Sequence, residues 1–262
     1  MKVIFTDPDG TLLDQKTYSF QPAEESLNLI KEKNIPLVIC SSKTRAEIEF
    51  WRKKLENDHP FISENGGGIF IPKNYFSFEL SYDREDKNYF IIQLGIDYHK
   101  LIEVLKKIEK NFAVRGFNQM SVREITKDSG LPLKQALMAK KREFDEPFII
   151  LKESHRKKVL KGIKKAGLTY TVGGRYHHLL GKNDKGKACR ILKSLYMKEY
   201  EKVVIIAIGD SENDFPMLNQ ADRAYLVMKD DRTYATKKYK KAGAPGPAGW
   251  NEAIKKELSK NN

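Results

Sequence analysis

Short, almost entirely apolar runs alternate along this chain with segments of helical periodicity, and this alternation constrains the fold more than any other feature. Residues 2–6, 35–40 and 203–208 are such runs, and residues 23–33 and 45–55 have the apolar spacing of amphipathic helices. Strands that are apolar throughout are typical of parallel sheets, which helices cover on both faces. We therefore predict an α/β fold in which right-handed crossovers connect the strands of a parallel sheet.

This rhythm is interrupted in the middle of the chain. Between residues 82 and 177, strand-like and helical stretches follow one another in a mixed order, and after residue 181 the α/β alternation resumes. We predict that residues 1–81 and 178–262 form a Rossmann-like α/β core and that residues 82–177 form an inserted α+β domain. Residues 243–247 contain two glycines and two prolines, so we expect a loop there before a C-terminal helix.

The composition argues against several classes of protein. Hydrophobic residues make up 40% of the 262 residues, but no run approaches the roughly 20 apolar residues of a membrane span. The apolar N-terminal stretch is too short for a signal peptide, so we expect a cytoplasmic protein without a membrane partner. The net charge of +13 comes from lysines interleaved with acids along the whole chain. This pattern favours a solvated basic surface, as in proteins from hot environments, over a nucleic-acid-binding site.

Acidic residues directly follow two of the predicted strands. Asp7 and Asp9 come after the first strand, and Asp210 and Asp214 come after the strand at residues 203–208. Because parallel α/β sheets bind their ligands beyond the carboxyl ends of the strands, we expect these side chains to meet there. Two carboxylates 4 Å apart repel each other by roughly 4 kcal/mol at an effective dielectric constant near 20, so the cluster needs a cation. A set of ligands made only of oxygen favours Mg²⁺ over Zn²⁺.

Two serines and a lysine are predicted at the same edge of the sheet. Ser41 and Ser42 follow the strand at residues 35–40, and their hydroxyl groups can donate hydrogen bonds to a phosphoryl oxygen. Lys185 precedes the helix that leads to the next strand and can neutralise Asp7 and a phosphate group. Together these residues predict a site for a phosphate ester.

The motifs, in this order, resemble the four motifs of the haloacid dehalogenase-like hydrolases. They are Asp7-Pro8-Asp9-Gly10-Thr11, a serine after the next strand, Lys185-Gly186, and Gly209-Asp210 with Asn213-Asp214. The resemblance implies that Asp7 is the nucleophile and forms an aspartyl-phosphate. It implies that Asp9 protonates the leaving oxygen and then activates the water that cleaves this intermediate. Ser41 and the backbone of Ser42 would hold the phosphoryl group, whose negative charge Lys185 would stabilise.

The same resemblance implies a metal site. Asp7, the carbonyl oxygen of Asp9 and Asp210 would hold Mg²⁺ as the cofactor. Asn213 and Asp214 would support the loop, the water molecules on the metal or the lysine of the third motif.

The predicted insertion resembles a narrower group. It lies between the serine and the lysine motifs, which in this superfamily is the place of the larger type of cap, a domain that closes over the site and contacts the substrate. Five stretches resemble the mannosyl-3-phosphoglycerate phosphatases, namely residues 41–45, 116–121, 130–131, 139–148 and 174–179. The resemblance implies hydrolysis of mannosyl-3-phosphoglycerate to mannosylglycerate, a compatible solute, and phosphate.

The chemistry of that substrate predicts how the cap would contact it. The substrate carries a phosphate, a carboxylate and sugar hydroxyls, and Arg142 and Arg175 can bind a carboxylate in bidentate geometry. We expect Glu143, or alternatively Glu146, to accept hydrogen bonds from the sugar. Neighbouring residues on a strand point to opposite faces, so at most one of the adjacent histidines reaches the pocket, and we assign His178.

Three other functions are compatible with the sequence. A general sugar-phosphate phosphatase and a phosphomannomutase-like phosphotransferase share the nucleophile and the cap. A basic nucleic-acid-binding protein with a vestigial hydrolase core is the alternative from another class, and the complete set of motif carboxylates argues against it. We expect the partner to be a small phosphorylated sugar or glycerate rather than a nucleic acid.

Overall fold

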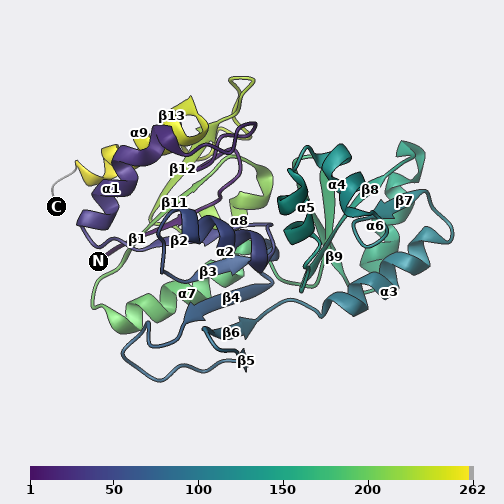
Figure 1. Ribbon diagram of the computed structural model, residues 1–262, viewed down its shortest axis with the longest axis horizontal. Coiled ribbons are helices and arrows are strands. Elements are labelled where there is room, and N and C mark those ends of the chain that lie inside the picture. Colours follow the sequence, from purple (N-terminus) through teal and green to yellow (C-terminus); the bar gives the residue numbers. More distant parts are fainter. Residues whose placement is uncertain (260–262) are drawn as a thin grey trace.

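The computed structural model describes residues 1–259 and has two lobes, a larger core and a smaller cap, at the left and right of Figure 1. Residues 260–262, which the sequence analysis assigns to the core, lie outside the described residues. Each lobe is built around a sheet of its own.

The core sheet places three strand ends side by side. Within the described residues its strand order is β13 (Lys240–Pro245), β12 (Arg223–Met228), β11 (Val204–Gly209), β1 (Lys2–Thr6), β2 (Leu37–Cys40), β3 (Phe61–Ser63), β4 (Gly68–Pro72), β6 (Tyr89–Gln93) and β5 (Arg84–Glu85). The strands from β13 to β3 pair in parallel, and β4, β6 and β5 add an antiparallel edge. This confirms the predicted α/β class. Because β1 lies between β11 and β2, the carboxyl ends of these three strands meet at one edge, where α/β sheets bind ligands.

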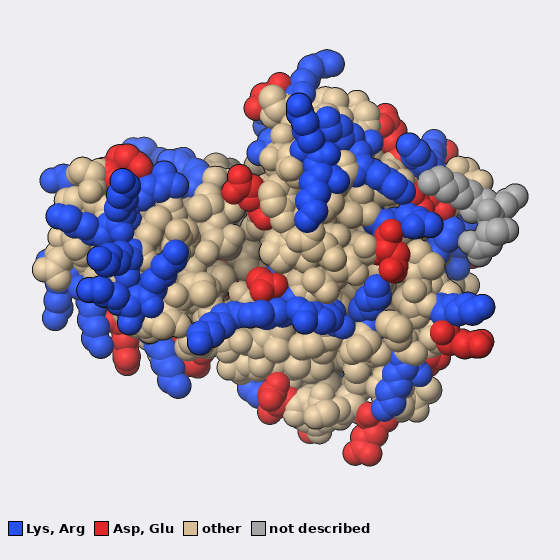
Figure 2. Space-filling model, turned by 180° about the vertical axis from the view of Figure 1, so that it is seen from behind, with Lys and Arg blue, Asp and Glu red and all other residues tan. Residues whose placement is uncertain are grey.

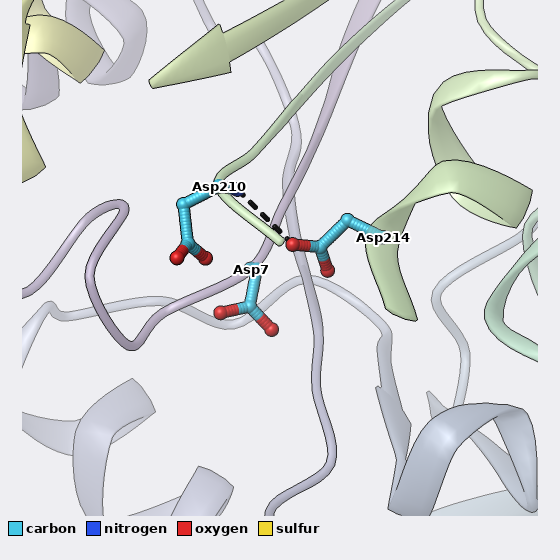
Figure 3. Close-up of side chains that lie close together, drawn as sticks. All are labelled: Asp7, Asp210 and Asp214. Carbon is cyan, nitrogen blue, oxygen red and sulfur yellow. Dashed lines mark hydrogen bonds between the residues drawn. The ribbon is translucent and has the colours of Figure 1, made fainter. Parts of the chain in front are cut away.

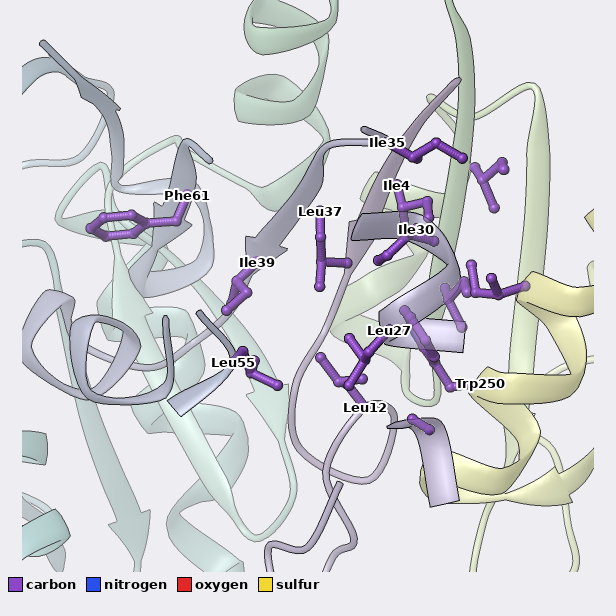
Figure 4. Packing of buried hydrophobic residues seen from close by; sticks show 14 of the residues in the cluster. Ile4, Leu12, Leu27, Ile30, Ile35, Leu37, Ile39, Leu55, Phe61 and Trp250 are labelled. Carbon is purple, nitrogen blue, oxygen red and sulfur yellow. The ribbon is translucent and has the colours of Figure 1, made fainter. Parts of the chain in front are cut away.

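Helices cover both faces of the core sheet. α1 (Glu24–Glu32), α2 (Arg45–Lys54) and α9 (Gly246–Leu258) contribute to the cluster of buried residues on one face, part of which Figure 4 shows. α7 (Lys185–Glu199) and α8 (Phe215–Leu218) pack with the other face. Trp250 of α9 is fully buried, and its indole Nε1 donates a hydrogen bond of 3.1 Å to Oγ1 of Thr6, the residue before Asp7. Among residues 1–259, no helix has the length and apolarity needed to cross a membrane.

The cap is an antiparallel sheet between two pairs of helices. Its strand order is β7 (Val114–Gly116), β8 (Asp145–Ile150), β10 (Tyr176–Leu180) and β9 (Thr169–Gly173). α3 (Tyr98–Glu109) and α6 (Arg156–Lys165) share one hydrophobic cluster with the sheet. α4 (Val122–Ser129) and α5 (Leu133–Ala139) form a second cluster, against which Ile149 and Tyr176 pack. The inserted segment therefore has the α+β architecture predicted from the sequence.

Strand pairing corrects three of the predictions. β6 pairs with β4 and β5 pairs with β6, so the insertion does not begin at residue 82. β10 pairs with β8 and β9, so the core does not resume at residue 178. The chain crosses between the lobes at residues 94–97 and 181–184. Hydrophobic periodicity identifies a strand but not the sheet that it joins, and this explains both shifts. The predicted loop at residues 243–247 is absent, because β13 ends at Pro245 and α9 begins at Gly246. An edge strand such as β13 tolerates proline and glycine.

A buried polar contact fastens the segment before β8 to the core. The carboxylate of Glu64 accepts hydrogen bonds from the backbone N–H groups of Glu143 and Phe144 at 3.0 and 2.8 Å. The side-chain amide of Asn65 donates to Asp145 at 2.7 Å. A Cβ atom at Gly67 would lie only 2.3 Å from Cβ of Phe144, so the close packing of the two lobes requires glycine there. We call Glu64, Asn65, Phe144 and Asp145 the clasp.

Replacing Trp250 tests how far α9 stabilises the core. Trp250→Ala removes a fully buried side chain and its hydrogen bond to Thr6, so the free energy of unfolding should fall by about 3–5 kcal/mol. Urea denaturation measures the change. The control is Met197→Ala, at a residue that is 58% exposed, which should stay within about 0.5 kcal/mol of the parent. Equal stability of the two variants would contradict this account of the core.

The clasp predicts a dependence of stability on pH. Burial raises the pKa of Glu64 from 4.5 to about 8, and the nearby Asp145 acts in the same direction, against Arg142 and the two N–H donors. Between these two pH values the folded state keeps a proton that the unfolded state has lost. The free energy of unfolding should therefore fall as the pH rises through this window, with a slope approaching about 1.4 kcal/mol per pH unit for this proton.

Urea denaturation from pH 5 to pH 8.5 checks this dependence. Glu64→Gln keeps an oxygen that can accept the two N–H bonds but cannot titrate, so its stability should fall less steeply with pH than that of the parent. Glu85→Gln, on the exposed strand β5, should keep the parental slope. A Glu64→Gln protein with the parental slope would show that another group carries the pH dependence.

Candidate functional site

A glycine turn brings the residues after β1 next to those after β11. Gly10 has a φ of +67°, and a Cβ atom there would lie 2.8 Å from Oε1 of Gln15 and 3.3 Å from Oδ2 of Asp210. Only glycine therefore lets this turn pass so close to Asp210. The hydroxyl of Thr11 also donates a hydrogen bond of 3.4 Å to Asp210. Two segments about 200 residues apart in sequence thus form one site, as the sequence predicts.

Lys185 joins these two segments from a third. It begins α7, its side chain is 1% exposed, and its ammonium lies 2.5 Å from Asp7 and 2.7 Å from Asp214. The second oxygen of Asp214 accepts hydrogen bonds from the backbone N–H groups of Asp210 and Ser211, both at 3.1 Å. Burial opposes the charge of Lys185, but the carboxylates of Asp214 and Asp7 outweigh it and raise the pKa of the ammonium. The predicted contact of Lys185 with Asp7 is present in the structure.

The carboxylates at this edge exceed the charge of the lysine. Asp7, Asp210 and Asp214 each offer an oxygen within 4.8 Å of the others, and Figure 3 shows the three side chains converging. Burial, with repulsion from Asp214 next, raises the pKa of Asp210 to about 7. Burial also raises the pKa of Asp7, and the neighbouring carboxylates add to this. Because both oxygens of Asp214 have protein partners, Asp7 and Asp210 are the carboxylates of this cluster that fit a hard divalent cation.

The structure separates the roles expected of the two serines. Ser41 is 1% exposed, and its hydroxyl oxygen accepts a hydrogen bond from the backbone N–H of Lys43 at 3.0 Å. Ser42 lines the pocket instead. The strand β2 ends just before this pair, so its alternation decides which side chain points inward. Ser41 is not among the residues that line the cavity, and its contact with a phosphoryl group stays a prediction.

A cavity of about 790 Å³ lies between the motif loops and the cap. The core contributes Asp7, Asp9, Ser42, Asp210 and Asn213 to its walls, and the cap contributes Phe117, Leu131, Arg142, Arg175, Tyr176 and His178. The space-filling view in Figure 2 shows a hollow between the two lobes. The site is therefore large enough for a substrate with a sugar and a phosphorylated acid.

The predicted cap residues are not equivalent in the structure. The Arg142 side chain is 5% exposed and donates hydrogen bonds to the carbonyl oxygens of Ala139 and Ser42, both at 2.9 Å. Arg175 pairs with Asp128 at 3.2 Å on the rim of the cavity. Glu143 pairs with Arg84 at 3.1 Å and does not line the cavity, so it is not placed to bind the sugar.

The two histidines alternate as expected of neighbours on a strand. His178 lines the cavity, and its Nδ1 lies 3.0 Å from Asp145 of the clasp. His177 packs near Phe148 on the opposite face of the cap sheet. Asn213, predicted to support the loop, receives a hydrogen bond of 2.8 Å from the hydroxyl of Ser211 and donates one of 3.4 Å to Asn65.

Sequence reasoning missed a second buried lysine. The Lys43 side chain is 6% exposed and lines the cavity, with its ammonium 2.9 Å from Asp9 and 3.7 Å from Glu47. Its position directly after the predicted serine pair was the available signal. The clasp residues Glu64 and Asn65 were also missed.

The cap carries most of the net positive charge. Residues 96–181 contain 19 Lys and Arg against 9 Asp and Glu, while the whole chain has 48 against 35. Figure 2 shows Lys and Arg gathered on this lobe, at the left of the view. A cationic lobe beside the cavity raises the local concentration of anions there.

Proteins with similar sequences share almost the whole chain. The glucosyl-3-phosphoglycerate/mannosyl-3-phosphoglycerate phosphatase of Methanococcoides burtonii is 48% identical over 99% of this chain and 98% of its own length. A protein of the same name from Persephonella marina is 44% identical over 96% of this chain and 95% of its own length. The mannosyl-3-phosphoglycerate phosphatase of Pyrococcus horikoshii is 38% identical over 87% of this chain and 90% of its own length.

Solved structures share the fold at low sequence identity. A protein of Thermoplasma acidophilum superposes with a TM-score of 0.70 at 20% identity, covering 98% of this chain and 97% of that one. A sugar phosphatase of subclass IIB of the haloacid dehalogenase superfamily gives 0.67 at 17% identity, covering 98% of both chains.

The family itself follows from the match of the whole motif set. The model of the haloacid dehalogenase-like hydrolases matches residues 4–240, which include all four motifs and the cap between them. Since these motifs also meet in one site in the structure, the chain belongs to the haloacid dehalogenase-like hydrolase family.

Proposed function

We propose that this protein is a phosphatase that hydrolyses mannosyl-3-phosphoglycerate and glucosyl-3-phosphoglycerate to the corresponding glycosylglycerate and phosphate. The observation that carries the proposal is the identity of 48% and 44% with two phosphatases named for both esters, over at least 95% of each chain. The motifs of the sequence predict the mannosyl ester as substrate, and the names of these relatives add the glucosyl ester. The cavity between the motif loops and the cap supports an acidic, sugar-bearing substrate.

The first chemical step uses Asp7 and Asp9. A carboxylate oxygen of Asp7 attacks phosphorus while the bond from phosphorus to the glycerate oxygen breaks, and Asp9 donates a proton to that leaving oxygen. The ion pair with Lys185 orients Asp7 and offsets the negative charge that gathers around phosphorus. The products of this step are an aspartyl-phosphate and the free glycosylglycerate.

The second step returns Asp7 to its starting state. Asp9, now a carboxylate, accepts a proton from a water molecule as the water oxygen attacks phosphorus. The bond between phosphorus and the Asp7 oxygen breaks, and inorganic phosphate leaves. The backbone and side chain of Ser42 are at the cavity wall, where they can donate hydrogen bonds to the phosphoryl oxygens.

The site is suited to Mg²⁺ as a cofactor. The carboxylates of Asp7 and Asp210 and the carbonyl oxygen of Asp9 would hold the ion, while Asp214 holds Lys185 and the backbone after β11. Bound Mg²⁺ would neutralise carboxylates that otherwise repel each other and polarise a phosphoryl oxygen of the substrate. The raised pKa values of Asp7 and Asp210 support a site that requires a cation.

Substitution of the nucleophile tests the proposed reaction. Phosphate release from both glycosyl-3-phosphoglycerates and from a panel of hexose phosphates should be measured with Mg²⁺. Asp7→Asn should lower kcat by about a thousandfold or more, because it removes the group that forms the covalent intermediate. Asp58→Asn, at an exposed acid, is the control with the same chemical change. Activity that survives in Asp7→Asn would refute the mechanism, and equal rates over the panel would refute only the substrate assignment.

Removal of the metal tests the cofactor independently. EDTA should abolish phosphate release, and Mg²⁺ should restore it. Mg²⁺ should also raise the melting temperature of the parent, since an ion that binds only the folded state stabilises it. Asp210→Asn should require at least about tenfold more Mg²⁺ for the same shift, because one charged ligand is lost. A melting temperature that responds equally in both proteins would place the ion elsewhere.

A further inference from the structure

Lys43 is a buried cation at the wall of the substrate cavity. Its side chain is only 6% exposed, although it lines the cavity, and it follows Ser42 directly. Removing an ammonium group from water costs several kcal/mol unless charged partners compensate it. The partners of Lys43 therefore indicate what its charge is used for.

One partner of Lys43 is fixed and the other faces the cavity. Oε1 of Glu47 lies 3.7 Å from the ammonium, while Oε2 of Glu47 accepts hydrogen bonds from the backbone N–H and the hydroxyl of Thr44 at 2.9 and 3.0 Å. This capping box at the start of α2 holds Glu47 in place. Asp9 is the second partner, at 2.9 Å, and its side chain is 32% exposed and lines the cavity. Lys43 can therefore exchange Asp9 for another anion without becoming unpaired.

Three other cations at or near the cavity have partners within the protein. Lys185 is paired with Asp7 and Asp214, and Arg142 donates to Ser42 and lies 3.3 Å from Asp145. Arg175 pairs with Asp128 on the rim. Lys43 lies beside Asp9, which donates the proton to the leaving oxygen, and none of these three groups does.

The distances suit a substrate whose ester oxygen and second anion are close together. The ester oxygen must come within about 3 Å of Asp9 to receive its proton, and Asp9 lies 2.9 Å from Lys43. In a 3-phosphoglycerate ester, four bonds of about 1.5 Å separate the ester oxygen from a carboxylate oxygen, so the two are at most roughly 5 Å apart. The carboxylate can thus reach the ammonium while the ester oxygen contacts Asp9.

We propose that Lys43 determines specificity by binding the carboxylate next to the phosphate ester, in exchange for its ion pair with Asp9. This inference rests on the proposed function and names the part of the substrate that the core recognises. Binding of the carboxylate draws Lys43 away from Asp9 and leaves Asp9 free to contact the leaving oxygen. An ester without this carboxylate leaves Lys43 on Asp9.

Binding of two small ligands tests this proposal without turnover. 3-Phosphoglycerate and glycerol 3-phosphate share the phosphate ester at carbon 3 and differ at carbon 1, which is a carboxylate in the first and an alcohol in the second. Their dissociation constants should be measured by calorimetry, with Mg²⁺, in the Asp7→Asn background. We expect at least about tenfold tighter binding of 3-phosphoglycerate, the usual effect of one charge-assisted hydrogen bond. If the two ligands bind equally tightly in this background, the proposal is wrong, and no substitution of Lys43 is needed to show it.

Substitution of Lys43 tests whether this lysine causes the preference for 3-phosphoglycerate. Adding Lys43→Gln should reduce it to about twofold or less, with little change for glycerol 3-phosphate. Lys53→Gln, which removes the same charge from an exposed site on α2, should keep the preference. Equal weakening of both ligands by Lys43→Gln would mean that Lys43 binds the phosphoryl group or only maintains the loop. Loss of the preference in Lys229→Gln instead would assign the carboxylate to that other lysine of the cavity wall.

A second variant tests the exchange with Asp9 and does not remove Lys43. Asp9→Asn eliminates the anion that competes for the ammonium, so the preference for 3-phosphoglycerate should rise by several-fold. If the preference for 3-phosphoglycerate is unchanged or smaller, the proposed exchange is wrong. This result can be obtained even if Lys43→Gln does not fold. Because these measurements report binding, they can succeed even if neither glycosyl-3-phosphoglycerate proves to be hydrolysed.

Discussion

The buried ion pairs of Lys185 with Asp7 and Asp214 are the constraint on which the catalytic edge depends. They connect the end of β1, the start of α7 and the turn after β11, which lie far apart in the sequence. A buried ammonium without partners costs several kcal/mol, and so does a buried carboxylate, so the three groups are stable only together. The strand order supplies the geometry, because β11 and β2 flank β1 and all three strands end at the same edge.

Lys43 forms a similar arrangement with Asp9 and Glu47. Each lysine lies between two carboxylates. In each case one carboxylate is held by backbone N–H groups, while the other is the more exposed of the two and faces the cavity. Asp214 is held by the N–H groups of Asp210 and Ser211, and Glu47 by that of Thr44. The carboxylate held by the backbone keeps the lysine in place, so the carboxylate that faces the cavity is available for the reaction. Asp7 and Asp9, the two acids assigned to the reaction, are the cavity-facing members.

The sequence predicted the parts of the structure that local patterns determine. The apolar runs at β1, β2 and β11 predict buried parallel strands. Because α/β sheets bind ligands beyond the carboxyl ends of such strands, Asp7, Asp210 and Lys185 are predicted at one site. The ends of the insertion were wrong, because pairing partners are long-range choices that periodicity does not encode. Lys43 and Glu64 escaped notice because burial of a charged residue depends on partners from other segments.

The contacts of the cap limit what it contributes to recognition. Arg142 donates a hydrogen bond to the carbonyl oxygen of Ser42, and Asp145, which contacts His178, accepts one from Asn65. Polar residues of the cap that line the cavity are therefore also connected to the core. A displacement of the cap would move the loop that carries Ser42 and Lys43, since Arg142 contacts its backbone. The cap therefore acts on the phosphoryl site through the position of this loop. Phe117, Leu131 and Tyr176 form the less polar part of the cavity wall. Under the proposed function they would contact the sugar, and such a wall distinguishes weakly between sugars that differ at one hydroxyl.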